Sequence, residues 1–194
     1  MKSKVVKLKN NLKAKLVFSQ IDDYYTLFAK DEGNNVVGCC NFSVVMNYAR
    51  ELTSPQREMF AKKKNLKPEE VQSLVFVHGS PQKFSSYEQV ENGVKIGNNI
   101  YTHVNNYCTL DKIEIRDARY HKVGLGTEML NYVIDFAKQQ NCYKIDAFVY
   151  PNGEFKFSTL QFYKRNGFVF DKNNNATKQL LELEESVDKN INKE

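Results

Sequence analysis

The pattern of hydrophobic and polar positions changes its period at Gly124. Before this residue, short runs of aromatic and β-branched residues are separated by polar turns, which is typical of β-strands. After it, apolar residues recur at steps of three and four, which predicts a helix with one buried face that ends near Gln140. The residues that carry this helical pattern are Leu125, Met129, Leu130, Val133, Ile134, Phe136 and Ala137.

The first half of the chain predicts mainly strands. A turn at 31–34 joins two of them into a β-hairpin. A helix is expected from Ser54 to about Lys64, because a serine followed by a proline suits a first turn, and a second short helix is expected from Lys67. Residues 79–98, rich in Gly, Ser, Gln and Asn, predict a long loop. The expected strands are 14–19, 24–30, 35–45, 73–78, 100–104 and 107–116.

Strand and helix alternate again in the last third of the chain. A strand is expected at 143–150, and Ser158 can cap a further helix. Two strands at 168–170 and 178–184 are then expected to form a hairpin about three consecutive asparagines. From 109 to 170, the predicted order of elements is therefore strand, glycine turn, helix, strand, helix, strand.

The length of the chain bounds its organisation. With 194 residues, of which 41% are apolar, it can form one domain with its own core. We expect residues 1–186 to form that domain, with an unusual insertion at 46–98, and residues 187–194 to form a polar tail. The N-terminus lacks a signal-peptide pattern, and no apolar run has membrane-spanning length. These features predict a soluble, cytoplasmic protein with no membrane partner.

Charge and cysteine content narrow the possible sites. The chain has 28 basic and 23 acidic residues, a formal charge of +5. This mild excess favours a solvated surface but leaves nucleic acid or an anionic cofactor open as a partner. The four cysteines form no CxxC pair, and none has zinc-ligand spacing with a histidine. We therefore expect buried free thiols and no metal site.

Gly124 and Gly126 stand between a predicted strand and a predicted helix. The first N–H groups of a helix have no intrahelical acceptor, so this turn can cradle a pyrophosphate. The amides of residues 123–127 would bind it, and Lys122 would add a cation. An ordinary tight turn explains a GxG pattern equally well. A dinucleotide-binding turn is excluded, because it needs a third glycine and an acidic residue after the next strand.

Two motifs at the correct separation resemble the GNAT superfamily of N-acetyltransferases. The first is His121-Lys122-Val123-Gly124-Leu125-Gly126, and the second is Phe162-Tyr163-Lys164-Arg165-Asn166-Gly167-Phe168. The resemblance covers residues 108–185 and, more loosely, the hairpin at 24–45. It implies an α+β fold of the α/β sandwich type. Its mixed, mostly antiparallel central sheet would have flanking helices and a V-shaped splay between the fourth and fifth strands.

The chain also departs from the family pattern. His121 replaces the usual Arg or Gln, which affects cofactor binding little if the amides do most of the work. Only residues 20–23 separate the first two expected strands, where the family usually has two helices. The insertion at 46–98 is where displaced helices would lie. We expect this insertion to form a wall of the acceptor site.

The resemblance implies transfer of an acetyl group from acetyl-CoA to an amine by direct attack. It makes Tyr163 the candidate acid for the leaving thiolate, although a core aromatic is the alternative. Asp111, acting through water, and Glu114 are candidate bases, and their odd spacing puts them on opposite faces of a strand. Each also fits a surface or structural carboxylate. The expected cofactor-binding residues are Ile113, Glu114, Ile115, His121, Lys122, Val123, Gly124, Leu125, Gly126 and Thr127.

Three functions follow, and the sequence leaves them open. The first is an acyl-CoA-dependent N-acyltransferase acting on a small-molecule or protein amine. The second is a coenzyme A-binding module without turnover. The third is an acetyltransferase that acts on aminoacyl-tRNA or another nucleic-acid-associated amine, suggested by the charge of +5 and by Lys62-Lys63-Lys64. Neither the acceptor nor the oligomeric state can be read from the sequence.

Overall fold

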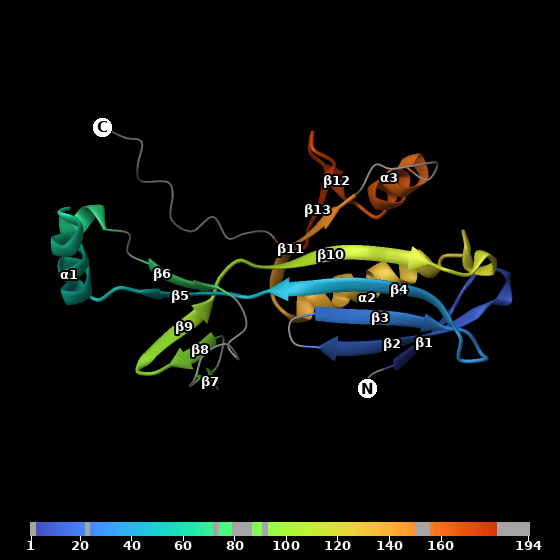
Figure 1. The fold of residues 1–194 in the computed structure, drawn as a ribbon, viewed down its shortest axis with the longest axis horizontal. Helices are drawn as coiled ribbons and strands as arrows, with labels where there is room; N and C mark the ends of the chain where they lie inside the picture. Colours follow the sequence, from blue (N-terminus) through green and yellow to red (C-terminus); the bar gives the residue numbers. More distant parts are fainter. Residues whose placement is uncertain are drawn as a thin grey trace. The chain divides into compact units, whose positions relative to one another are not determined.

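The computed structural model describes residues 3–21, 24–71, 74–78, 87–90, 93–149 and 156–181. The chain divides into two compact units (Figure 1). The main unit combines Met1–Val44 with Tyr107–Glu194, and the inserted unit is Val45–Asn106. No helix within the described residues has both the length and the apolar character that crossing a bilayer requires.

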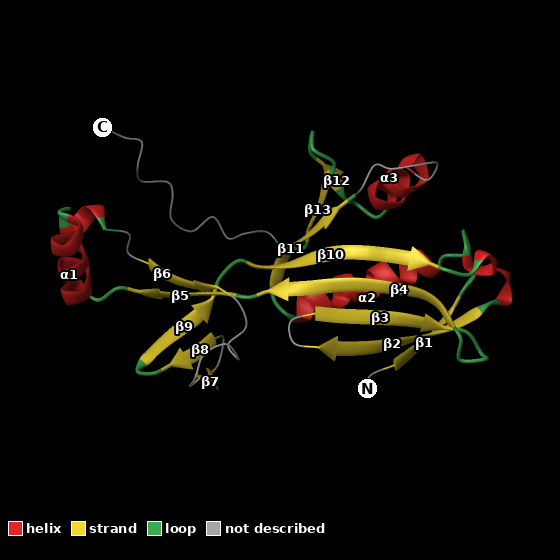
Figure 2. Ribbon diagram, in the orientation of Figure 1, coloured by secondary structure: helices red, strands yellow, loops and turns green. Residues whose placement is uncertain are grey.

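The main unit is built on an eight-stranded sheet (Figure 2). Neighbours β10 and β11 are joined by helix α2 (Leu125–Gln139), the connection typical of a parallel pair, whereas β1 to β4 pair antiparallel in sequence. The mixed, mostly antiparallel α+β fold that the resemblance implied is therefore confirmed. The strand order is β1 (Ser3–Lys7), β2 (Lys13–Ile21), β3 (Tyr24–Lys30), β4 (Val36–Val45), β10 (Asn106–Ile115), β11 (Cys142–Phe148), β13 (Asn175–Gln179) and β12 (Val169–Phe170).

Helix α2 covers one face of this sheet. Phe136 on α2 contacts three aromatic rings of the sheet at centroid separations of 4.9 to 5.6 Å. Burying an apolar side chain of this kind contributes about 1.5–3 kcal/mol, so the predicted apolar face of α2 fixes the helix on the sheet. The three rings belong to Phe18 on β2, Tyr25 on β3 and Phe42 on β4. The fully buried residues of α2 are Leu125, Met129, Leu130, Val133 and Ala137.

Helix α3 (Lys156–Arg165) is followed by the hairpin of β12 and β13. The second strand of this hairpin was expected at 178–184 but begins at Asn175. The strand begins earlier than expected because the turn before it is short. The Asp171 carboxylate accepts hydrogen bonds from the N–H groups of Asn173 and Asn175, both at 2.8 Å, which closes the turn before residue 176. The polar tail expected at 187–194 lies outside the described residues.

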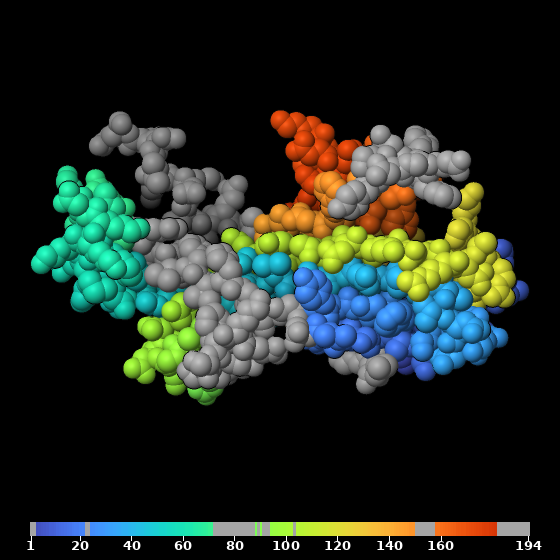
Figure 3. All heavy atoms as spheres, viewed as in Figure 1, coloured from blue at the N-terminus to red at the C-terminus, as the bar shows by residue number. Residues whose placement is uncertain are grey.

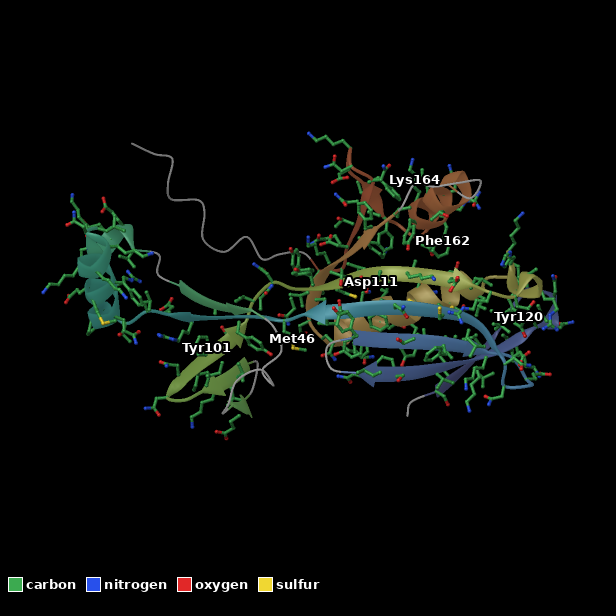
Figure 4. The ribbon with its side chains drawn as sticks, viewed as in Figure 1. Met46, Tyr101, Asp111, Tyr120, Phe162 and Lys164 are labelled. Carbon is green, nitrogen blue, oxygen red and sulfur yellow. The ribbon has the colours of Figure 1, made fainter. Side chains whose placement is uncertain are left out.

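The inserted unit is a five-stranded sheet with one α-helix. Its core contains Tyr48, Val94 and Tyr101, with Met46 and Ile96 packed against them (Figure 4). The elements are β5 (Asn47–Glu51), α1 (Ser54–Lys64), the 3-10 turn η2 (Pro68–Glu70), β6 (Leu74–His78), β7 (Tyr87–Val90), β8 (Gly93–Ile96) and β9 (Asn99–His103), and the sheet order is β6-β5-β9-β8-β7.

One sequence prediction for the inserted unit is wrong, and two strands of the chain were not predicted. Residues 79–98 were expected to be a loop, but β7 and β8 lie within them as an antiparallel hairpin, with Tyr87 opposite Ile96. The polar composition of this segment did not indicate these strands, which pair with each other, and β8 pairs also with β9. The strand β1 was not expected at all, since the N-terminus is rich in lysine and only Val6 is buried there. Strand β5 was not predicted either, because the expected strand ended at 45 and the next expected element was the helix from Ser54. The remaining strands and the helices α1 to α3 lie where the pattern placed them, within a few residues.

Candidate functional site

The two glycines after β10 form a tight entrance to α2. A 3-10 turn, η4 (Ala118–Tyr120), precedes them. Gly124, the residue before the helix, has a φ of 101°, which side chains rarely tolerate. A Cβ at Gly126 would lie 3.4 Å from Phe162 Cε2 of α3. The first glycine therefore permits the turn, whereas a Cβ at the second would make an ordinary van der Waals contact with α3.

Two polar side chains hold the segment that leads into this turn. His121 Nε2 lies 3.2 Å from the carbonyl oxygen of Ile115, the last residue of β10. Asp117 accepts hydrogen bonds from the main-chain N–H of Arg119 at 2.9 Å and from its Nη2 at 2.6 Å. Arg119 holds the pKa of Asp117 below its usual value through these hydrogen bonds. His121 therefore shapes the turn, and it is not among the residues that line the pocket beside it.

A pocket of about 980 Å³ opens along the glycine turn. The N–H groups of the first turn of α2 have no intrahelical acceptor, and the helix dipole adds positive charge there. These residues thus fit an anion such as a diphosphate. The lining residues are Lys7, Leu8, Lys9, Ile115, Tyr120, Lys122, Val123, Gly124, Leu125, Gly126, Thr127, Glu128, Ser158, Gln161, Phe162, Arg165 and Asn166.

Seven of the ten residues expected to bind a cofactor line this pocket, namely Ile115 and residues 122–127. His121, Ile113 and Glu114 do not. The sequence reasoning missed the wall contributed by residues 7–9 and the part contributed by α3. The second family motif, at 162–168, indicated that α3 is part of the site. The contact between the N-terminal residues and the glycine turn could not be predicted from any local sequence pattern.

Glu114 lies in an ion-pair cluster on β10. Its Oε2 is 3.0 Å from Lys112 Nζ and 3.1 Å from Arg116 Nε. The Cys39 thiol donates a further hydrogen bond to the same oxygen at 3.5 Å. Lys112 and Arg116, in that order, lower the pKa of Glu114 to about 2. A carboxylate held in this way accepts a proton poorly.

Asp111 (Figure 4) lies in a different place, a cleft of about 600 Å³ lined by residues of β10, β11 and β13. In the space-filling view β10 forms a band along the visible face of the main unit, with β4 on one side and β11 on the other (Figure 3). The splay between these strands that the resemblance implied stays a prediction, since β10 and β11 are hydrogen-bonded neighbours in the sheet. Asp111 is exposed overall, but the cleft walls partly bury its carboxyl, and this raises its pKa.

The other two carboxylates of this cleft already have partners. Asp146 forms an ion pair with Lys144 and accepts a hydrogen bond from Thr177 Oγ1 at 2.9 Å. Asp171 closes the turn before β13. Among the described residues, no hydrogen bond or ion pair engages Asp111.

Tyr163 lies on α3 with only 7% of its surface exposed. Its ring packs edge-on against three phenylalanines, the nearest of them Phe168 and Phe162 at centroid distances of 5.2 and 5.3 Å. Burial, and after it the nearby Cys40 sulfur, raises the pKa of Tyr163. The phenol therefore stays protonated. Tyr163 lines neither the pocket at the glycine turn nor the cleft at Asp111.

The four cysteines are free and buried, as expected. Burial raises the pKa of each thiol, that of Cys142 to about 12. Among the described residues, no three His, Cys, Asp or Glu side chains gather as a metal ion would need.

Comparison with known proteins gives one family match. Residues 92–168 match the model described as the acetyltransferase (GNAT) family. No protein of curated function matches the sequence.

Solved structures with similar backbones include two GNAT acetyltransferases. The one from Staphylococcus aureus Mu50 is 16% identical, with a TM-score of 0.44 over 82% of this chain and 70% of that one. A putative one from Desulfovibrio desulfuricans is 13% identical, with a TM-score of 0.43 over 82% and 71%. AtaT, solved with acetyl-methionyl-tRNAfMet, is 11% identical, with a TM-score of 0.39 over 81% and 71%.

Proposed function

Residues 92–168 belong to the acetyltransferase (GNAT) family, and on this premise we propose that the protein transfers an acetyl group from acetyl-CoA to the nitrogen of an amine. The observation that carries the proposal is the pocket at the start of α2, where unpaired helical N–H groups and Lys122 line one wall. Bound acetyl-CoA would supply a thioester carbonyl that an uncharged amine can attack.

The cofactor would be held by the main chain more than by side chains. The amides of residues 123–127 bind the diphosphate, and the end of β10 at 113–115 pairs with the pantetheine arm as an added strand would. Ile115 connects these two parts, because it ends β10 and also lines the pocket. Gly124 and Gly126 keep side chains away from the diphosphate.

Asp111 is the favoured base. An amine that enters as an ammonium must lose a proton before it can attack, and a carboxylate with a raised pKa accepts one more readily than Glu114, whose pKa is about 2. Asp111 also lines an open cleft, whereas Glu114 is held by Lys112 and Arg116. Asp111 takes the proton directly or through one water.

Tyr163 is the favoured acid. Its hydroxyl carries a proton at neutral pH that a leaving thiolate can take, and burial, by raising the pKa, makes it a weaker acid than an exposed phenol. The rings of Phe162 and Phe168 fix the orientation of the phenol. Since Tyr163 lines neither the pocket nor the cleft, the role requires bound acetyl-CoA to bring its sulfur to the phenol hydroxyl.

The acceptor is an amine of unassigned identity, and the cleft at Asp111 is the place where it would approach. A panel of amines, including a polyamine, an aminoglycoside, a lysine peptide and an aminoacyl-tRNA, should be screened with acetyl-CoA by thiol release and mass spectrometry. A product with at least one amine supports the proposal. Tight binding of acetyl-CoA with no product from any class favours a binding module without turnover. Absence of acetyl-CoA binding rejects both.

A nucleic-acid substrate has weaker support. Lys62, Lys63 and Lys64 form the last turn of α1, where cations stabilise the negative end of the helix dipole. This gives the cluster a structural role without RNA. In the screen, acetylation of aminoacyl-tRNA that weakens steeply with salt would support the nucleic-acid alternative. We also propose a cytoplasmic location, where acetyl-CoA and reduced cysteines are both found.

A further inference from the structure

We propose that Lys7 and Lys9 bind the 3′-phosphate of coenzyme A, which makes the N-terminal strand β1 part of the cofactor site. The inference rests on the proposed function and goes beyond it, because it assigns the nucleotide end of the cofactor to a wall of the pocket formed by residues far from both sequence motifs. Residues 7–9 are the lining residues of the pocket that come from the N-terminus.

This wall is attached directly to the glycine turn. The main-chain N–H of Lys9 donates a hydrogen bond to the carbonyl oxygen of Val123 at 3.0 Å. The hydroxyl of Tyr120, a buried residue of η4, donates to the carbonyl oxygen of Lys13 at 3.3 Å. Both ends of the loop between β1 and β2 are thus held to the segment that enters α2, and the two segments meet at one end of the sheet (Figure 1).

The loop between β1 and β2 has a geometry that favours asparagine. Asn10 and Asn11 both have a φ of 58°, the left-handed region that asparagine tolerates better than most residues. They reverse the chain within the 3-10 turn η1 (Lys9–Asn11), and Leu8 N–H bonds Leu12 carbonyl at 2.8 Å. The reversal places Lys9 beside Val123 instead of along the sheet edge.

The pocket has more positive charge than a diphosphate at the helix needs. Lys7, Lys9, Lys122 and Arg165 line it, against a single carboxylate, Glu128. Lys7 and Lys9 are exposed, and neither forms an ion pair within the described part of the chain. The amides at the start of α2 can donate the hydrogen bonds that a diphosphate needs. Lys7 and Lys9 are therefore available to bind a second anionic group. Coenzyme A carries one such group, a phosphate on the 3′ position of its ribose.

The test compares coenzyme A with 3′-dephospho-coenzyme A by isothermal titration. Because two lysine ammonium groups attract the dianionic 3′-phosphate, the wild-type protein should bind coenzyme A at least about tenfold more tightly than the dephospho form. In Lys7→Gln/Lys9→Gln, the affinity for coenzyme A should fall until the two ligands differ by less than about threefold, while the affinity for the dephospho form stays nearly unchanged.

The matched control is Lys4→Gln/Lys15→Gln. It removes the same charge from exposed positions on β1 and β2 that do not line the pocket, so the preference for coenzyme A should persist. Equal wild-type affinity for the two ligands would overturn the inference and leave the proposed function intact. Equal losses for both ligands in the Lys7/Lys9 variant would overturn it too. If the wild-type protein binds neither ligand, the proposed function itself fails.

Discussion

The carboxylate of Glu114 and the guanidinium of Arg116 form an ion pair on one side of β10, with Oε2 3.1 Å from Nε. Arg116 also donates to the Cys39 sulfur at 3.5 Å, so the pair is linked to β4. Three residues earlier on the strand, Asp111 lines the cleft and has no such partner among the described residues. Strand β10 therefore carries two carboxylates, one held in ion pairs and one open to a ligand in the cleft.

The two carboxylates should respond differently to neutralisation. Asp111→Asn should lower kcat by about 10²-fold or more, the usual contribution of a general base. Glu114→Gln should change kcat by less than about threefold, because a carboxylate paired at the surface contributes little beyond local structure. Steady-state rates with the acceptor found in the screen measure both. A larger loss in Glu114→Gln than in Asp111→Asn would reverse the assignment of the base.

The ion pairs of Glu114 should also appear in the pH dependence of stability. Its pKa is lowered from 4.5 to about 2 in the folded protein. A lowered pKa stabilises the fold above the unfolded value, and that contribution is lost as pH falls from about 4.5 towards 2. Glu114→Gln should therefore have a lower Tm than wild type at pH 7, with the difference shrinking below pH 4.5. Thermal unfolding across pH 2 to 7 measures it.

The control for this measurement is Asp135→Asn, which removes an exposed carboxylate from α2 in the same unit. It should leave the pH dependence of Tm close to that of wild type. A constant difference between Glu114→Gln and wild type at every pH would mean that the ion pairs do not account for the lost stability.

The buried phenol of Tyr163 should matter for rate and not for cofactor affinity. Tyr163→Phe keeps the ring contacts with Phe162 and Phe168 but removes the proton donor. We expect kcat to fall by about 10- to 100-fold, with an unchanged dissociation constant for acetyl-CoA. Tyr132→Phe on α2, which also removes a phenol hydroxyl, should be nearly silent. An unchanged kcat in Tyr163→Phe would leave Tyr163 as a core residue only.

The main elements could be predicted because their signals are local. The 15-residue helix α2 has a periodic apolar face, and the glycine turn stands directly before it. The ion pairs of Glu114 had a local signal as well, since a spacing of two puts Lys112, Glu114 and Arg116 on one face of a strand. This spacing alone weakens the case for Glu114 as a base.

Other features depend on contacts between distant segments. Lys9 reaches Val123 across more than a hundred residues, through the pairing of β1 with β2 and the reversal at Asn10. The hairpin of β7 and β8 is polar and is stabilised by β9. The apolar alternation in these segments is short, covering only Val94 and Ile96 in β8, so a sequence pattern could not distinguish them from a frayed end and a loop.

The thiols should be unreactive in the folded protein. Burial raises the pKa of Cys39, Cys40, Cys108 and Cys142, so few thiolates exist near neutral pH and reagents cannot reach them. A thiol-specific chromogenic reagent at pH 8 should titrate all four only after denaturation. This also gives the thiol-release assay a low background. Rapid reaction of a full equivalent in the native protein would contradict the burial of at least one cysteine.

Gly124 and Gly97 provide a matched pair that separates backbone strain from ligand binding. Both have positive φ, 101° and 59°, and an added Cβ would meet no atom within 4 Å at either position. Each substitution by alanine should therefore destabilise its own unit by about 1–2 kcal/mol through backbone strain alone. Only Gly124 lies at the pocket, whereas Gly97 lies in the turn between β8 and β9 of the inserted unit.

Gly124→Ala should therefore weaken acetyl-CoA binding by about tenfold or more, because the strained turn shifts the amides that hold the diphosphate. Gly97→Ala should leave that affinity unchanged. Isothermal titration and denaturant unfolding of both variants measure the two effects separately. If Gly124→Ala loses stability but keeps its full affinity, the diphosphate does not depend on the conformation of this turn, and the amides of residues 123–127 are not its main ligands.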